Sequence, residues 1–222
     1  MPKLLILGCS LSDYTRVDKP WGELLADTLN YEYIHEAAGC GSNWRMWRRA
    51  FTLIENNTIT PSDTVIIQYT EVTRREFWSP YQTEARPLSG SNNKSFLTEA
   101  YDGGTIIRYK LDSHTFGDYV EPEKKFQKQY NHFINLKFEL EQFHMMHKMF
   151  QCFMQQQGFE NLYFLKGGGY GPLESADDLI PFYQKNWIDG SKCLVWHLPK
   201  DHLHMDQRGH RELASLVHKY IK

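Results

Sequence analysis

The stretch KLLILGCSLS, residues 3–12, decides the fold. Residues 3–7 form a continuous apolar run, and Gly8 follows directly. This pattern is typical of a strand that is buried on both faces and then enters a tight turn. Strands of that kind belong to parallel sheets with helices on both faces. The turn that follows this strand carries the hydroxyl group of Ser10.

Helical and strand patterns alternate along the rest of the chain. Apolar residues at helical spacing predict helices over 20–29, 44–55, 126–157 and 206–221. Short apolar and β-branched runs predict further strands at 31–35, 64–69, 161–166 and 193–198. This alternation predicts an α/β fold in which a parallel five-stranded sheet is covered by helices on both faces, as a three-layer sandwich.

The length of 222 residues suits a single domain that spans residues 1–222. Residues 78–125 interrupt the alternation, because Gly, Ser, Asn, Pro and charged residues dominate there. A structureless loop of this length is unusual in a compact domain. We therefore expect an insertion or lid with some local structure, such as a hairpin around Thr105–Lys110.

The charge and hydropathy of the chain exclude several partners. The formal net charge is −2, so no global positive field exists to attract nucleic acid or an anionic membrane. The basic residues Arg45, Arg48 and Arg49 share a predicted helix, where we expect a solvated face. No apolar stretch approaches the roughly 20 residues that span a bilayer, and the N-terminal run is too short for a signal peptide. The sequence predicts a soluble cytoplasmic protein.

Chemistry in a parallel sheet is expected in the turns beyond the carboxyl ends of the strands. A serine hydroxyl needs a base within hydrogen-bond reach, and the base needs a partner that fixes its tautomer. Ser10 is the predicted nucleophile, His204 the base and Asp201 the residue that orients it. Backbone N–H groups of Ser10 and of Gly41 or Gly39 are the predicted donors to the oxyanion, since glycine permits a close approach of the backbone.

At these residues the chain resembles the SGNH (GDSL-type) hydrolases. The matching blocks, in the order of the family, are LLILGCSLS (4–12), AAGCGSN (37–43) and DHLHMDQRGH (201–210). The resemblance implies a flavodoxin-like α/β/α sandwich that hydrolyses acyl esters without a cofactor. The implied substrate is a small-molecule or carbohydrate ester, including O-acetyl groups on sugars. An aromatic content of 14% suits stacking on sugar rings.

Two positions depart from the family pattern. Cys9 stands in place of the family's aspartate, and Thr70 stands where the family has an asparagine that donates to the oxyanion. Loss of one such donor costs about 100- to 1000-fold in rate. Asn43 or Gln68 are alternative donors. The alternative function is therefore a weak or inactive binding or structural protein with the same fold.

A metal-dependent hydrolase is the third possible class. His202, His204, Asp206 and His210 are metal-ligand residue types close together in sequence. Alternate residues of a loop diverge, however, and His210 falls inside a predicted helix. The cysteines form no C-x-x-C pair. We therefore predict no metal.

Overall fold

The central feature is a five-stranded sheet in the order β2-β1-β3-β6-β7, in which every neighbouring pair is parallel. The computed structural model describes residues 1–14, 17–38, 41–70, 72, 75–78, 104–107, 136–166, 186–190 and 205–221. The sheet strands are β1 (Lys3–Gly8), β2 (Glu32–Ala37), β3 (Thr64–Gln68), β6 (Leu162–Lys166) and β7 (Trp187–Asp189). This order is that of the flavodoxin-like folds.

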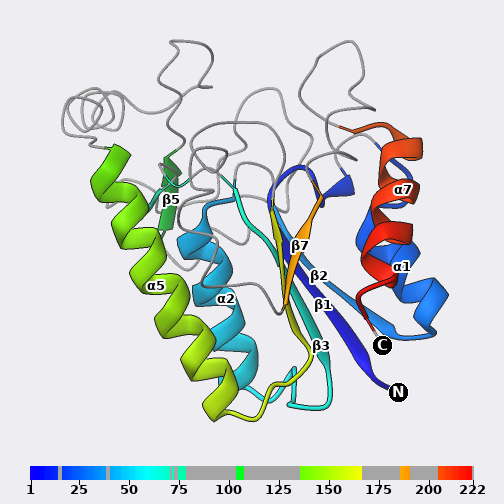
Figure 1. The fold of residues 1–222 in the computed structure, drawn as a ribbon, viewed down its shortest axis with the longest axis horizontal. Coiled ribbons are helices and arrows are strands. Elements are labelled where there is room, and N and C mark those ends of the chain that lie inside the picture. Colours follow the sequence, from blue (N-terminus) through cyan, green and yellow to red (C-terminus); the bar gives the residue numbers. More distant parts are fainter. Residues whose placement is uncertain are drawn as a thin grey trace.

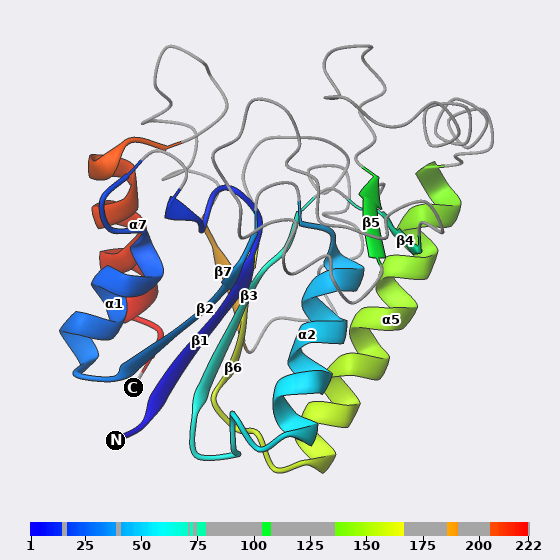
Figure 2. The ribbon, with the colours of Figure 1, turned by 180° about the vertical axis from the view of Figure 1, so that it is seen from behind.

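Four helices of the described residues cover the sheet and complete three layers (Figures 1 and 2). They are α1 (Trp21–Leu29), α2 (Asn43–Glu55), α5 (Leu136–Gln156) and α7 (Gln207–His218). α1 and α7 lie side by side on one face, while α2 and α5 cover the other. The predicted three-layer α/β architecture is confirmed. Among the helices that the structure describes, none combines the length and apolar character needed to cross a membrane.

The fifth strand of the sheet is not the predicted one. Residues Trp187–Asp189 pair with β6, whereas the predicted segment 193–198 lies outside the described residues. Within β7 only Ile188 is buried, while Trp187 is half-buried and Asp189 is exposed. A three-residue edge strand with a single buried side chain has too short a pattern to be distinguished from a loop.

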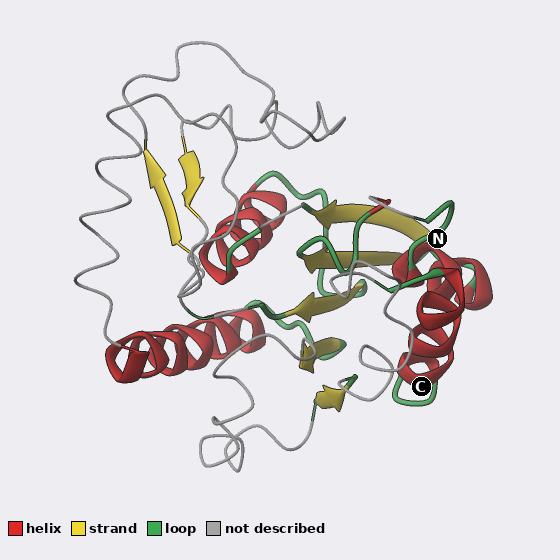
Figure 3. Cartoon of the chain, turned by 90° about the horizontal axis from the view of Figure 1, so that it is seen from above, coloured by secondary structure: helices red, strands yellow, loops and turns green. Residues whose placement is uncertain are grey.

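Two further strands form a separate antiparallel pair. β4 (Arg75–Trp78) pairs with β5 (Gly104–Ile107), with Arg75 opposite Ile107. Figure 3 shows this pair apart from the main sheet. The hairpin expected around Thr105–Lys110 therefore overlaps a real strand. Residues 79–103 and 108–135 lie outside the described part, so the insertion or lid remains a prediction.

The core lies on both faces of β1 and β3. The side chains of Leu4 to Leu7 and of Val65 to Ile67 are completely buried. α1 packs closely against this sheet because its second residue is Gly22. A Cβ at Gly22 would lie 2.6 Å from Ile6 Cγ1 and 2.9 Å from the Tyr33 hydroxyl. A larger residue there would push the helix away from the sheet.

The solvated face predicted for the arginines of α2 is wrong for Arg45. Arg45 is 2% exposed, and its Nη1 donates to the backbone carbonyl of Glu36 at 2.7 Å. Arg49 also donates to both carboxylate oxygens of Glu36, at 2.6 and 2.9 Å. Glu36, near the carboxyl end of β2, thus places its acceptor oxygens between the sheet and α2. The sequence pattern of α2 alone does not reveal this acceptor.

A chain of polar groups crosses the aromatic core between β3 and α5. The Trp47 indole donates to the Tyr69 hydroxyl at 3.1 Å, and that hydroxyl lies 2.7 Å from His147 Nδ1. His147 is fully buried. Burial, with a smaller contribution from His144, lowers the pKa of His147 to about 3. The imidazole is therefore neutral at pH 7, and its Nδ1 shares a hydrogen bond with the Tyr69 hydroxyl.

This buried imidazole makes the stability pH-dependent. The unfolded chain binds a proton at His147 near pH 6.5 and the folded chain only near pH 3. The contribution of His147 to the free energy of unfolding is complete above pH 6.5 and declines by about 1.4 kcal/mol per pH unit as the pH falls toward 3. His147→Gln keeps a hydrogen-bonding group for Tyr69 but does not titrate. We therefore expect this variant to show a weaker dependence of the free energy of unfolding on pH in this range. Urea unfolding between pH 3.5 and 7.5 measures both slopes; equal slopes in the two proteins contradict the assignment.

Candidate functional site

The candidate site lies at the edge where β1 and β3 end. The chain leaves β1 toward β2 on one side, and β3 continues the sheet on the other. In open parallel sheets a crevice forms at this switch in strand order, beyond the carboxyl ends of the strands. Ser10 follows the end of β1 by two residues, and Thr70 follows the end of β3 by the same number. Because β1 and β3 are adjacent and parallel, both residues lie at this edge.

Ser10 occupies a tight turn. The backbone N–H of Ser12 donates to the Cys9 carbonyl at 2.9 Å, which makes Ser10 and Leu11 the central residues of the turn. Ser10 is half-buried, whereas Cys9 and Ser12 on either side are buried. The turn therefore offers Ser10 to solvent while its neighbours face the protein.

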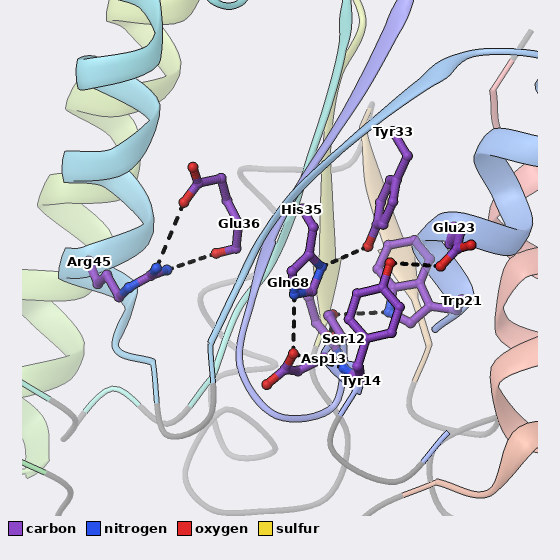
Figure 4. Close-up of polar contacts among 10 residues, drawn as sticks. All are labelled: Ser12, Asp13, Tyr14, Trp21, Glu23, Tyr33, His35, Glu36, Arg45 and Gln68. Carbon is purple, nitrogen blue, oxygen red and sulfur yellow. Dashed lines mark hydrogen bonds and ion pairs between the residues drawn. The ribbon is translucent and has the colours of Figure 1, made fainter. Parts of the chain in front are cut away.

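Ser12 holds this turn to the rest of the molecule (Figure 4). Its hydroxyl pairs with Gln68 Oε1 and accepts from the Trp21 indole at 3.0 Å. A Cβ at Gly8 would lie 2.7 Å from Ser12 Oγ, so only glycine at this position lets Ser12 fold back over the end of β1. Gln68 is completely buried, and within the described residues its Nε2 has no hydrogen-bond partner. Gln68 thus supports the turn, a role that the sequence did not reveal.

Gly41 lies against the end of β1. A Cβ at Gly41 would lie 3.0 Å from the Gly8 carbonyl and 3.0 Å from the Ala38 carbonyl. The close approach that requires glycine is therefore made to protein backbone. The Gly41 N–H, predicted as an oxyanion donor, donates instead to the Ala38 carbonyl at 2.9 Å. Gly39, the other predicted donor, lies outside the described residues.

Asn43 and Thr70 are joined by two hydrogen bonds. Asn43 Oδ1 accepts from the Thr70 N–H at 2.9 Å, and its Nδ2 donates to the Thr70 carbonyl at 3.1 Å. Both residues are buried. Asn43 begins α2 directly after Ser42, whose hydroxyl caps the helix by accepting from the Arg45 N–H. The amide of Asn43 thus fixes the chain that leaves β3. Both the N–H and the carbonyl of Thr70 are engaged in this contact.

A second anchor for the Ser10 turn was not predicted. His35 Nε2 lies 3.1 Å from Asp13 Oδ1, and its Nδ1 lies 2.9 Å from the Tyr33 hydroxyl (Figure 4). Asp13 also accepts from the Tyr14 N–H at 2.8 Å. Tyr33 and His35 alternate along β2 and so share the face toward α1. That alternation was the available signal in the sequence.

The two tyrosines of this cluster stay protonated. Burial is the main cause that raises the pKa of Tyr33 well above its usual value. Burial and the hydrogen bond to Glu23, at 2.7 Å, raise the pKa of Tyr14 as well. Both hydroxyls therefore remain neutral donors around His35 and Glu23 at physiological pH.

The start of α7 is fixed beside the start of α1. Asp206 caps α7 by accepting from the Gly209 N–H at 2.8 Å. His210 Nδ1 accepts from the Trp21 N–H at 3.0 Å, and Gln207 Nε2 donates to the Lys19 carbonyl at 2.7 Å. Asp206 and His210, two of the residues weighed as metal ligands, thus serve helix starts. The predicted Asp201 and His204, like His202, lie outside the described residues, in the segment that leads directly into this helix.

Comparisons with known proteins concern the fold. No protein-family profile matches the chain. No curated protein matches it in sequence. Among solved structures, a putative lipolytic protein of the G-D-S-L family from Desulfitobacterium hafniense matches with a TM-score of 0.55 at 10% identity, over 100% of both chains.

Two further structures match at a similar level. The lipase/acylhydrolase from Enterococcus faecalis has a TM-score of 0.51 at 12% identity and covers 99% of this chain and 94% of its own. A lipase from a goat rumen metagenome has a TM-score of 0.51 at 11% identity, with 99% and 97% covered. The chain therefore has the fold of the GDSL-type (SGNH) hydrolases, as its sequence blocks predicted.

The contact between Asn43 and Thr70 predicts a large effect on stability. Asn43→Ala leaves two buried backbone groups of Thr70 without a partner, and we expect it to lower the free energy of unfolding by about 2–4 kcal/mol. Asn56→Ala, at an exposed asparagine that accepts from the Thr58 N–H, is the matched control and should cost less than about 1 kcal/mol. Urea denaturation of both variants measures the difference. Equal losses of unfolding free energy in the two variants would mean that the hydrogen bonds between Asn43 and Thr70 do not stabilise the fold.

Proposed function

We propose that this protein hydrolyses small acyl esters through Ser10, His204 and Asp201. The observation that carries the proposal is the position of Ser10, half-buried in the turn after β1, because Ser12 of that turn and His210 of α7 both contact Trp21. The segment that contains Asp201 and His204 runs into that helix start. The fold of this protein also matches those of a putative G-D-S-L lipolytic protein and of a lipase/acylhydrolase.

In this proposal Ser10 Oγ attacks the ester carbonyl while His204 takes the hydroxyl proton. Asp201 holds the imidazole in the tautomer that accepts this proton. Collapse of the tetrahedral intermediate breaks the bond to the alcohol, which leaves with the proton from His204. Water, activated by His204, then hydrolyses the acyl-serine and regenerates Ser10. No cofactor is required by these steps.

The stabilisation of the oxyanion differs from the scheme expected from sequence. The Gly41 N–H and the Asn43 amide are both engaged in the protein. The proposed donors that remain are the Ser10 N–H, the Thr70 hydroxyl and Gln68 Nε2, which has no hydrogen-bond partner within the described residues. O-acetylated carbohydrates are the substrate class we propose to test first, because a small acetyl group needs the least room at this edge.

The engagement of the Gly41 N–H and the Asn43 amide within the protein also favours a second candidate function. A protein of this fold that lacks oxyanion donors binds a ligand at the same edge without cleaving it. In that case Ser10 is an ordinary turn residue, and a carbohydrate or a partner protein occupies the site. The two functions differ in one property, the nucleophilicity of Ser10.

The reactivity of Ser10 separates the two functions. We expect p-nitrophenyl acetate hydrolysis to fall at least about 1000-fold in Ser10→Ala, and to fall similarly in His204→Ala. A fluorophosphonate probe should label wild type at Ser10. Ser62→Ala, at an exposed serine before β3 on the opposite edge of the sheet, should keep full activity and labelling. Background hydrolysis in wild type, with Ser10 unlabelled, would favour the binding protein.

A further inference from the structure

Trp21 connects two parts of the site that are far apart in sequence. Its indole Nε1 donates to Ser12 Oγ at 3.0 Å, and its backbone N–H donates to His210 Nδ1 at 3.0 Å. The side chain is completely buried. Figure 4 shows the contact between Trp21 and Ser12. One residue therefore contacts both the turn that carries Ser10 and the helix that follows His204.

The contact with α7 supplies what the start of α1 lacks. The first N–H groups of a helix have no partner within the helix. Pro20 precedes Trp21, and no side chain at that position caps α1. His210, which is 3% exposed, provides the acceptor from α7. Because Nδ1 accepts, the imidazole carries its proton on Nε2, and its ring is fixed relative to α1.

The contact with Ser12 reaches the nucleophile through the turn itself. Ser12 closes the turn with its N–H on the Cys9 carbonyl, and its hydroxyl is held by Gln68 and Trp21 together. Ser10 is a central residue of that turn. A shift of Ser12 therefore tilts the turn and moves Ser10.

We propose that Trp21 is a positioning residue that keeps the Ser10 turn and the start of α7 at a fixed separation. This inference rests on the proposed hydrolase function, in which the nucleophile comes from the first turn and the base from the segment before α7. Trp21 acts through Ser12 on one side and through His210 on the other.

The kinetic test removes only the indole donor. Trp21→Phe keeps an aromatic ring and the backbone bond to His210. We expect kcat for p-nitrophenyl acetate to fall about 10- to 100-fold with KM unchanged, and fluorophosphonate labelling of Ser10 to slow by the same factor. Trp47→Phe, which removes the equivalent buried indole bond to Tyr69, is the matched control and should keep kcat within about 2-fold. Equal losses in the two variants would overturn the proposal.

A second measurement does not depend on catalysis. We expect Ser12→Ala to accelerate amide hydrogen exchange in residues 9–14 and also at the start of α7, residues 206–210, because the Trp21 indole loses its acceptor. Ser62→Ala should change neither region. Faster exchange confined to residues 9–14 would refute the connection, whether or not Ser10 is a nucleophile. Conversely, Ser12→Ala could accelerate exchange in both regions while the wild type stays unlabelled at Ser10. That result would refute the hydrolase function alone.

Discussion

The parallel pairing of β1 with both β2 and β3 is the constraint on which the candidate site depends. Because the strands run in one direction, the turns after β1, β2 and β3 all emerge at the same edge of the sheet. The tight packing at Gly8 and Gly41 then brings two of those turns into backbone contact. This pairing places Ser10 and Thr70, which are 60 residues apart in the sequence, at the same edge of the sheet.

The polar groups at this edge serve the protein first. The Asn43 amide forms hydrogen bonds with the Thr70 backbone, and the Gly41 N–H donates to the Ala38 carbonyl. Buried backbone groups without partners are costly, so these contacts stabilise the turns at the expense of free donors. The chemistry that we propose for this site thus depends on a small number of groups: Ser10, the Thr70 hydroxyl and Gln68 Nε2.

Much of the fold was predictable because its signals are local. The apolar run at 3–7 and the periodicity of α2 and α7 identify buried strands and amphipathic helices directly. The short edge strand β7 was missed, because one buried residue, Ile188, makes no pattern. Ser10 and Thr70 lie just beyond the ends of β1 and β3, while the functional roles of Ser10, Gly41, Asn43 and Thr70 stay predictions. What their side chains and N–H groups contact depends on pairings across the fold, such as Ser12 with Gln68, which sequence spacing does not encode.

The contact between α1 and α7 has a consequence for biosynthesis. The histidine whose imidazole accepts from the first N–H of α1 lies 189 residues further along the chain, in α7. This contact therefore cannot form in the nascent chain until α7 has been synthesised. A stop codon before position 206 would remove α7 and leave the Trp21 N–H without this acceptor.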